Sequence, residues 1–293
     1  MLGYGPSRDP SREGKPEGSL SAPPIEKAVI LARGLGTRMR RPDEAVSLDP
    51  LQSAVADSGV KAMIPIGRPF LDYILSALAD AGYREVCLVI GPEHRAVRDY
   101  YTVTAPPVRT RVTFATQVNP LGTADAVLAA AEFAAGEDFI VINSDNYYPV
   151  SALAALRMLS EQGTALFERD GLLRKSNIPP ERIRAFAVCV VSADGYLQSI
   201  LEKPDEAALR EAASTSLVSM NCWRFSPSIF RACRATPLSS RNEFELPQAV
   251  QYAITRSNER FRVVPFDEAV LDLSRRTDIG AVAERLRDTD VRP

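Results

Sequence analysis

Short apolar runs alternate with amphipathic stretches along the first half of the chain. Four runs have the length of strands buried inside a sheet: 28–32, 85–90, 111–116 and 138–142. Three stretches that lie between them have the spacing of helices: 69–81, 93–101 and 123–134. Strands that alternate with helices indicate a parallel sheet covered on both faces. We therefore expect an α/β fold, a three-layer α/β/α Rossmann-like arrangement with a mostly parallel, mixed sheet.

The second half of the chain has a more mixed pattern. Apolar runs at 186–191 and 196–201 flank an Asp194-Gly195 turn, which is typical of a β-hairpin. Further strands are expected at 216–225 and 262–265, and helices at 226–233, at 246–256 and from about 278. By contrast, residues 41–60 are polar and irregular, so we expect a lid or a specificity loop there.

The pattern also predicts the domain boundaries. Residues 1–24 hold five of the 22 prolines and four of the 16 glycines, and such a segment cannot bury enough apolar surface to order itself. We expect a flexible extension there. Residues 25–293 would form a single domain, with a nucleotide-binding half at about 25–150 and an acceptor-binding half at about 151–293.

Composition excludes several classes of protein. The 35 basic and 37 acidic side chains give a formal charge of −2, which argues against a dedicated nucleic-acid binder. No run of about 18 apolar residues predicts a membrane span, and the start of the chain lacks the pattern of a secretory signal. We expect a cytoplasmic enzyme that binds neither nucleic acid nor membrane.

The cysteines and the histidine show no pattern of catalytic residues. None of the four cysteines belongs to a C-x-x-C pair, and we expect buried, neutral thiols. The only histidine, His94, is expected to be exposed and structural. A Ser-His triad or a zinc site is therefore not expected.

A glycine-rich turn, Arg33–Arg38, directly follows the first predicted strand. Glycines allow backbone N–H groups to surround a polyphosphate, and Arg38 adds a fixed positive charge. The turn is not a dinucleotide fingerprint, because Met39 stands where a third glycine would be required. The Gly-Lys-Ser/Thr ending of a Walker loop is also missing. Read alone, this turn is about equally consistent with a phosphate-binding loop and with an ordinary strand-to-helix connection.

Motifs farther along the chain give the turn its meaning. Together with Gly34–Arg38, the chain resembles the sugar-1-phosphate nucleotidylyltransferase family over residues 27 to 285. The segments that carry this resemblance are Lys61–Ile66, Arg68–Phe70, Gln117–Ala124, Asn143–Asp145, Glu202–Pro204, Met220–Asn221 and Leu271–Ile279. These separated elements occur in the order that the family shows, which makes the resemblance specific.

The resemblance implies an in-line displacement. An oxygen of the acceptor phosphate attacks the α-phosphorus of a nucleoside triphosphate, and pyrophosphate leaves. Such a transfer depends on positioning and charge neutralisation, so it requires no catalytic histidine or cysteine. Mg²⁺ is the implied cofactor, because it prefers a few carboxylates together with phosphate oxygens. The implied partners are a nucleoside triphosphate and a sugar 1-phosphate or an analogue.

The family roles transfer residue by residue to this chain. Arg38, Lys61 and Asp145 would be catalytic, with Arg38 at the leaving pyrophosphate and Lys61 at the α-phosphate. Asp145 and Asp272 would bind the metal. The implied acceptor-binding residues are Glu202, Lys203 and Asn221. The implied nucleotide-binding residues are Leu31, Ala32, Gly34, Gly36, Thr37, Gln117, Gly122 and Thr123, of which Gln117 and Gly122 would contact the base.

Departures from the family pattern leave parts of this assignment open. Arg33 stands where the family usually has alanine or glycine, and it either faces the triphosphate or turns to solvent. Ser144 replaces the usual glycine before Asp145. Ser274 replaces a usual glycine after Asp272, which weakens that assignment. The aromatic residues Tyr147, Tyr148 and Trp223 either stack on a sugar-like ring or pack in the core.

Two rival functions stay open at this point. The first is a catalytically silent relative on the same fold, against which Arg38, Lys61, Asp145 and Asp272 together argue. The second is a nucleotide-sugar-dependent glycosyltransferase, which usually shows a D-x-D motif, whereas Asn146 and Tyr147 follow Asp145. The resemblance fixes neither the nucleobase nor the acceptor, for which glucose 1-phosphate is the default and a heptose or cyclitol phosphate the alternative. It also leaves open whether the chain forms a homo-oligomer.

Overall fold

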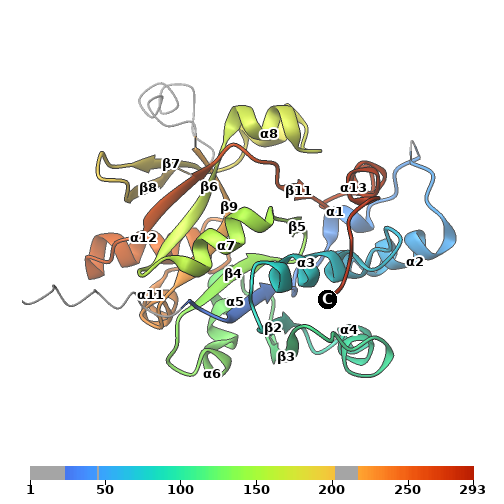
Figure 1. Ribbon diagram of the computed structural model, residues 1–293, viewed down its shortest axis with the longest axis horizontal. Coiled ribbons are helices and arrows are strands. Elements are labelled where there is room, and N and C mark those ends of the chain that lie inside the picture. The colour runs from blue at the N-terminus through green and yellow to red at the C-terminus, as the bar shows by residue number, and fades with distance from the viewer. Residues whose placement is uncertain (1–23, 45, 202–216) are drawn as a thin grey trace, which may run out of the picture.

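A nine-stranded mixed sheet runs through the centre of the molecule (Figure 1). The computed structural model describes residues 24–44, 46–201 and 217–293. The strands are β1 (Lys27–Leu31), β2 (Glu85–Ile90), β3 (Arg111–Thr116), β4 (Phe139–Asn143), β6 (Gly163–Glu168), β7 (Val188–Val191), β8 (Leu197–Leu201), β9 (Leu217–Phe225) and β10 (Arg262–Phe266). Their order along the main path is β10-β6-β9-β4-β1-β2-β3, and β7 joins it through β9 and pairs with β8.

The pairing of the strands separates a parallel part from an antiparallel part. β3, β2, β1 and β4 are parallel neighbours, as the alternation of strands and helices predicted. β9 runs antiparallel to both β4 and β6 and thereby joins the two halves of the sheet. A separate two-stranded ladder pairs β5 (Asn146–Tyr147) with β11 (Leu271–Asp272). The predicted mixed, mostly parallel α/β fold is confirmed.

Helices cover both faces of the sheet, and alternate residues of each strand point to opposite faces. In β1, Ala28 and Ile30 belong to the core on one face, which includes α3 (Phe70–Asp80), α7 (Val150–Met158) and α13 (Asp278–Leu286). Val29 and Leu31 belong to the core on the other face, against α5 (Thr123–Ala129), α11 (Ile229–Ala235) and α12 (Leu246–Ser257). These are the three predicted layers.

Short helices complete the structure at its ends. They are α1 (Thr37–Arg40), α2 (Pro50–Ser58), η1 (Lys61–Met63), α4 (Arg95–Asp99), η2 (Tyr100–Thr104), α6 (Ala131–Ala134), α8 (Arg169–Lys175) and α9 (Pro180–Arg184). Helices α1, α2 and α13 gather at one end of the molecule, on the right in Figure 1, and α11 and α12 lie at the other. None of the helices in the described ranges is long and apolar enough to cross a membrane.

The expectation of an irregular segment at 41–60 is wrong for residues 50–58. Residues Pro50–Ser58 form α2, which starts with a capping box in which Asp49 accepts from the Gln52 backbone N–H at 2.8 Å and the Asp49 N–H donates to Gln52. Pro50 stands at the first position of the helix, where its missing N–H costs nothing. Residues 50–58 are thus helical, and Gly59, which follows them, contacts Gly36 of the glycine-rich turn.

Other elements were absent from the sequence-based prediction. It contained neither α7 nor β6, although both lie in the core of the sheet region. The hairpin around Asp194-Gly195 is confirmed by antiparallel pairing of β7 with β8. The predicted extension at 1–24 lies outside the described residues except for residue 24.

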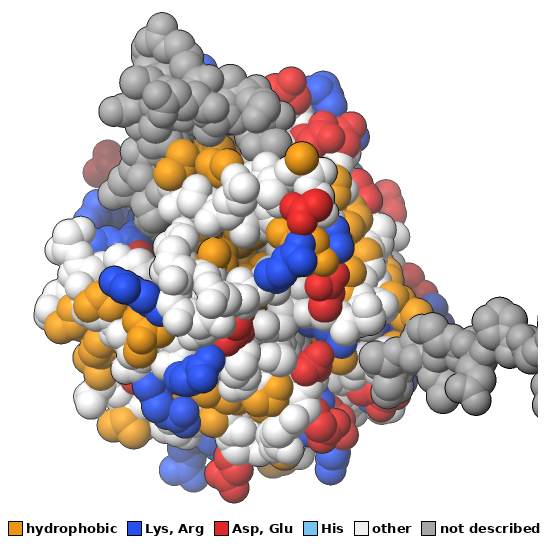
Figure 2. Space-filling view, turned by 90° about the vertical axis from the view of Figure 1, so that its left-hand side faces the viewer, with side chains coloured by type: hydrophobic (Ala, Val, Ile, Leu, Met, Phe, Trp, Pro, Cys, Tyr) orange, Lys and Arg blue, Asp and Glu red, His pale blue; other side chains and the backbone are white. Residues whose placement is uncertain are grey.

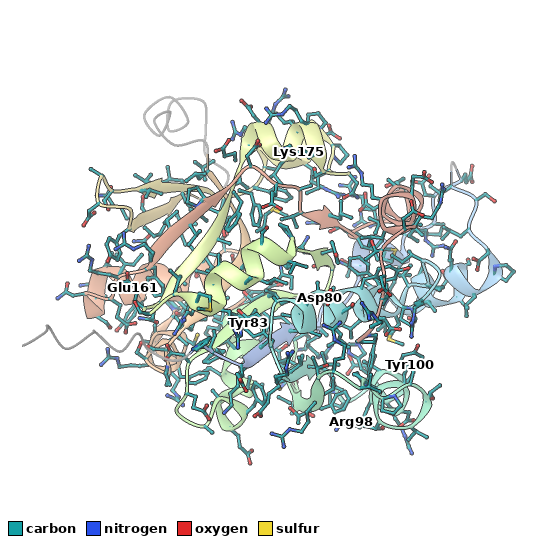
Figure 3. All side chains as sticks on the ribbon, viewed as in Figure 1. Asp80, Tyr83, Arg98, Tyr100, Glu161 and Lys175 are labelled. Carbon is teal, nitrogen blue, oxygen red and sulfur yellow. The ribbon has the colours of Figure 1, made fainter. Side chains whose placement is uncertain are left out.

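Polar contacts tie the outer helices to each other. Tyr83, labelled in Figure 3, is fully buried just after α3, and its hydroxyl donates to the Leu153 carbonyl of α7 at 3.0 Å. On the face that carries α12 and β7–β8, acidic and basic side chains are interspersed (Figure 2). That mixture agrees with the nearly balanced charge of the sequence.

Candidate active site

The carboxyl end of the parallel strands opens into a cavity of about 450 Å³. Parallel α/β sheets bind ligands at this edge, because loops diverge there and leave a crevice. The predicted residues that line the cavity are Leu31, Ala32, Gly34, Gly36, Thr37, Arg38, Lys61, Gln117, Gly122, Thr123, Asp145 and Asn221. Glu202 and Lys203 lie outside the described residues. The structure therefore brings most of the predicted residues to one place.

The glycine-rich turn forms one wall of this cavity. Ala32 donates its backbone N–H to the Val89 carbonyl at 2.9 Å, which holds the start of the turn against β2. Gly36 has a φ of 62°, in the left-handed region, and a Cβ there would overlap the backbone of Gly59. The turn is thus packed against the end of α2, and glycine is the residue that this contact admits.

Lys61 and Asp145 meet across the cavity. The Lys61 Nζ lies 2.7 Å from Oδ2 of Asp145, and both side chains are largely buried, at 19% and 25% exposure. Lys61 begins η1 directly after α2, whereas Asp145 follows β4. The packing of α2 against the turn therefore delivers a cation to the end of a central strand. A lysine at this place can neutralise charge on a phosphate as well as on the carboxylate.

Asp272 lies next to Asp145 through the backbone of the small ladder. Asp272 pairs with Asn146, and the Leu273 N–H donates to the Asp145 carbonyl at 2.8 Å. Its side chain is 7% exposed, and Arg182 of α9 approaches it at 3.4 Å. Burial, and then the negative charge of Asp145, raise the pKa of Asp272 to about 6. Two carboxylates thus share a poorly solvated region, although Asp272 itself does not line the cavity.

The carboxylates suit a divalent cation. Oδ1 of Asp272 is buried and has no hydrogen-bond partner among the described residues. A buried carboxylate oxygen without a partner is costly, and a cation would compensate for it. No cluster of three or more His, Cys, Asp or Glu side chains is arranged for a metal within the described part of the chain. Two carboxylates completed by phosphate oxygens and water are, however, the usual surroundings of Mg²⁺.

Arg38 lies at the exposed side of the cavity. It belongs to the four-residue helix α1, directly after the glycines, and it is exposed to solvent. No ion pair joins Arg38 to a residue in the described ranges, so its guanidinium is available to an anion. The sequence-based prediction of a positive charge beside the glycine-rich turn is consistent with this position.

Gln117 and Gly122 form the opposite wall. The Gln117 amide nitrogen donates to the Gly122 carbonyl at 3.0 Å and to Oδ2 of Asp125 at 2.7 Å. Gly122 has a φ of 111°, and a Cβ there would meet the carbonyl oxygen of Phe244 at 2.5 Å. The hydroxyl of Thr123 accepts from the Leu246 N–H at 2.8 Å, which anchors the start of α12. This wall is therefore rigid.

Asn221 reaches the cavity through an irregularity in β9. The register of β9 against β6 shifts between Ala165 and Leu166, and Asn221 has a φ of 55°. Such a bulge redirects one side chain out of the regular alternation. Its Oδ1 accepts from the Trp223 indole N–H at 3.3 Å, which fixes the amide.

Arg33 is not turned to solvent, and it is one of the residues that line the cavity. It is 8% exposed, its Nε donates to the Gln117 carbonyl at 3.2 Å, and its guanidinium lies 2.6 Å from Oε1 of Glu93. A Cβ at Gly91 would collide with this guanidinium. Arg33 thus joins the glycine-rich turn to the wall that holds Gln117.

The prediction of an exposed His94 is wrong. His94 is 7% exposed, and its Nδ1 accepts from the Gly91 N–H at 3.3 Å. Burial lowers its pKa below the usual value, and the nearby Arg33 acts in the same direction. The residue is structural, as predicted. All four cysteines are buried, as predicted, and burial raises their pKa, which favours the neutral thiol.

The aromatic residues near the site belong mainly to the core. Tyr148 and Trp223 are 1% and 0% exposed. The Tyr148 hydroxyl donates to the Met220 carbonyl at 2.6 Å and so ties the end of β4 to the bulge in β9. Core packing is therefore the correct alternative for these two residues, whereas Tyr147 is only partly buried.

Sequence reasoning missed Glu243 and Asn143 as residues of the cavity wall. Asn143 ends β4, two residues before Asp145, and its place in that motif was a signal that could have found it. Glu243 precedes α12 and is exposed beside Gly122. No local signal marks Glu243, because its position depends on the contact of 239–246 with residues 121–124.

Comparison with known proteins agrees with this geometry. The model of the family described as "Nucleotidyl transferase" matches residues 27–282. The chain is 26% identical to the UTP–glucose-1-phosphate uridylyltransferase AglF of Haloferax volcanii, over 89% of this chain and 97% of that protein. It is 29% identical to a glucose-1-phosphate thymidylyltransferase of Streptomyces antibioticus, over 78% of this chain and only 57% of that protein.

A solved structure shares the fold. The UDP-glucose pyrophosphorylase crystallised with UDP-glucose superposes with a TM-score of 0.69 at 19% identity, over 91% of this chain and all of that chain. The match of the family model spans most of the sequence and includes the glycine-rich turn, Lys61, Asp145 and Asp272. This chain therefore belongs to the nucleotidyl transferase family and is a nucleotidyltransferase.

Proposed function

We propose that this protein condenses UTP or dTTP with glucose 1-phosphate to give the nucleoside-diphosphate glucose and pyrophosphate. The names of two relatives support these substrates, since one is a uridylyltransferase and the other a thymidylyltransferase, both for glucose 1-phosphate. The cavity supports the same reaction class, because one wall is a glycine-rich turn and the other carries Gln117.

One observation carries the proposal. Lys61 and the carboxylate of Asp145 lie 2.7 Å apart at the end of β4, next to the buried carboxylate of Asp272 and opposite the glycine-rich turn. A cation, a carboxylate pair and a phosphate-binding turn are the parts that nucleotidyl transfer requires. An ordinary surface ion pair is exposed to solvent, whereas Lys61 and Asp145 are largely buried and both line the cavity.

The protein's own residues act mainly by position and charge. The turn at 34–37 would hold the β- and γ-phosphates through backbone N–H groups, and Arg38 would bind the pyrophosphate as it leaves. Lys61 would hold the α-phosphate. An oxygen of glucose 1-phosphate then forms a bond to the α-phosphorus, while the bond from that phosphorus to the bridging oxygen breaks. The electron pair leaves with pyrophosphate.

Asp145 and Asp272 would hold Mg²⁺. Oδ1 of Asp272 is buried, and no residue in the described ranges donates a hydrogen bond to it. A bound cation would compensate for the cost of burying this oxygen without a partner. When bound, Mg²⁺ supplies positive charge that neutralises the phosphate oxygens. Arg182 lies 3.4 Å from Asp272 and 3.1 Å from Asp278, and so holds the Asp272 carboxylate in place.

The acceptor would bind on the side of the second half of the chain. Asn221, fixed by Trp223, would contact glucose 1-phosphate, and Glu202 and Lys203 would add contacts to its hydroxyls and phosphate. This assignment divides one domain into a nucleotide-binding half at 25–150 and an acceptor-binding half at 151–293.

Pyrophosphate release tests the proposal directly. The protein is incubated with Mg²⁺, one of UTP, dTTP, ATP, GTP or CTP, and one of glucose, heptose or cyclitol phosphates. We expect the highest kcat/KM with UTP or dTTP and glucose 1-phosphate. Turnover of another pair would correct the substrates and leave the reaction standing. No pyrophosphate from any pair, with the protein folded, would favour a catalytically silent relative.

A further inference from the structure

The polar groups of Gln117 are almost all used within the protein. Its backbone N–H donates to the Ile90 carbonyl at 2.9 Å, and its carbonyl accepts from Arg33 at 3.2 Å. The two hydrogens of its side-chain amide go to the Gly122 carbonyl and to Asp125. Gln117 is 4% exposed and lines the cavity. Only its Oε1 lacks a donor among the residues that the structure describes.

The partners of this amide also fix its orientation. The oxygen and nitrogen of a glutamine amide can exchange places by a half-turn, and the partners decide which arrangement is stable. Both partners here, the Gly122 carbonyl and the Asp125 carboxylate, are oxygens that accept. A turned amide would place Oε1 against two acceptors, which is repulsive. Gln117 is therefore held as a hydrogen-bond acceptor towards the cavity.

Asp125 is the decisive partner in this arrangement. It contributes the shorter of the two bonds, at 2.7 Å, and it lies in the first turn of α5, eight residues after Gln117. An asparagine at this position could donate as well as accept, so it would stabilise both orientations of the glutamine amide. The Gly122 carbonyl alone would then hold the amide less firmly.

The geometry points to Asp125 as a positioning residue that sets base specificity by keeping Gln117 an acceptor. This inference rests on the proposed function, in which the base is uracil or thymine. N3–H is the only N–H of those rings in a nucleotide, so it is the donor that Oε1 of Gln117 takes. Cytosine presents an unprotonated N3 at the same place, and two acceptors would face each other. The site therefore selects a base with a ring N–H and rejects CTP.

The ratio of kcat/KM for UTP to that for CTP tests this inference. We expect the wild-type protein to prefer UTP by at least about a hundredfold, since a site built for a hydrogen bond strongly rejects a base that cannot make it. Asp125→Asn should lower this ratio by about tenfold or more, because the amide can turn and donate to cytosine N3. The change should arise in the KM for the nucleotide, while the KM for glucose 1-phosphate stays constant.

Glu132→Gln is the matched control. Glu132 lies in the first turn of α6, as Asp125 lies in the first turn of α5, and its side chain is exposed. Both substitutions remove one negative charge. The UTP-to-CTP ratio of E132Q should equal that of the wild type. An unchanged ratio in D125N, with the protein folded, overturns the inference. If D125N does not fold, Asp125→Ala is used instead, and the UTP-to-CTP ratio of kcat/KM should fall in the same way.

Binding measurements separate failure of the inference from failure of the proposed function. If no sugar phosphate is turned over, the proposed function fails, and calorimetric titration of UTP and CTP still tests the role of Asp125. Tighter binding of UTP than of CTP in the wild type, reduced in D125N, supports the inference. Equal binding of the two nucleotides to the wild type, or no binding of UTP, overturns it.

Discussion

At the scale of single residues, the proximity of the Asp145 and Asp272 carboxylates has a cost for stability. Burial, and then the negative charge of Asp145, raise the pKa of Asp272, as expected when two like charges lie close together in a poorly solvated place. Lys61 relieves part of this repulsion from 2.7 Å. An arrangement that keeps two like charges close is typical of a site selected for binding rather than for stability.

Replacement of Asp145 tests that interpretation. Asp145→Asn should reduce kcat by at least about a hundredfold, since one ligand of the proposed metal is lost. The melting temperature should change little, because loss of the like charge beside Asp272 offsets loss of the ion pair with Lys61. Asp267→Asn is the control, since Asp267 forms an exposed ion pair with Lys175 at 2.9 Å, away from the cavity. Near-normal turnover in folded D145N would remove the metal assignment.

His94 makes a second residue-scale prediction, on pH. Burial lowers its pKa in the folded state below the ordinary value of 6.5, so the unfolded chain binds a proton more readily. Stability from this residue is complete above about pH 6.5 and is lost as the pH falls through the lowered folded pKa. His94→Asn keeps an acceptor for the Gly91 N–H but does not titrate. We expect the melting temperature of H94N to fall less steeply than that of the wild type below pH 6.5.

The groups that face His94 act in opposite directions on its pKa. Burial lowers it most strongly, Glu93 raises it, and Arg33 and Arg40 lower it further, so the opposing effect of Glu93 is outweighed. The melting temperatures of H94N and the wild type are measured from pH 5 to 8. If both fall equally steeply below pH 6.5, His94 does not contribute to acid sensitivity.

The family pattern named residues that lie far apart in the sequence and that the structure brings together. Lys61 and Asp145 were predicted 84 positions apart, and they are in contact. The position of Arg33 could not be predicted, because its partners Gln117 and Glu93 belong to other loops and no local pattern indicates them. A residue whose role depends on long-range contacts gives no signal in a local sequence.

At the scale of elements, the glycine-rich turn depends on its support by α2 and α13. Arg276, just before α13, is 8% exposed, donates to the Met39 carbonyl at 2.9 Å and forms an ion pair with Asp57 of α2. The contact of Gly36 with Gly59 joins the same elements. The turn is therefore packed against the end of α2 and against Arg276. The same packing determines the position of Lys61, which follows α2 in the sequence.

Glycine-to-alanine substitutions test this support. Gly36→Ala should destabilise the protein by more than about 1 kcal/mol, since its φ is 62° and its Cβ would overlap the Gly59 backbone. Gly280→Ala is the control, because Gly280 lies in α13 and its Cβ would meet nothing within 4 Å. That substitution should raise stability by about 0.5–1 kcal/mol. Denaturant unfolding measures both changes, and equal stability of G36A and the wild type would refute the packed-turn interpretation.

The elements that sequence patterns missed have specific physical reasons. Periodicity cannot indicate β5 and β11, which are two residues long each, yet this ladder brings Asp272 to Asp145. The helix α2 was missed although its capping box, Asp49 with Gln52, is readable in the sequence. At 41–60 the capping box is better evidence for a helix than the polar composition is for a loop.

At the scale of the whole molecule, the sheet order exceeds what alternation can predict. The parallel strands β3, β2, β1 and β4 follow from the alternating pattern, but the insertion of β9 between β4 and β6 does not. That insertion depends on antiparallel contacts between segments more than 50 residues apart, for example Thr164 with Trp223. It also creates the bulge at Asn221, so the least predictable part of the fold forms the acceptor side of the proposed site.

The four cysteines report on the unfolding of this sheet. Cys222 belongs to the core on one face, and Cys87, Cys189 and Cys233 belong to the core on the other. Burial raises the pKa of Cys87 to about 11 and those of Cys189 and Cys233 to about 12, so thiolate is almost absent at pH 8. Because the thiolate is the reactive form, the native protein should be inert to a disulfide reagent.

Thiol labelling should therefore follow global unfolding. We expect fewer than one thiol per chain to react with excess disulfide reagent at pH 8 within minutes, and four to react in denaturant. UTP should slow labelling further, because a ligand that binds only the folded state lowers the unfolded fraction. Rapid reaction of one thiol in the native protein, unaffected by UTP, would instead show that one face of the sheet opens independently of the site.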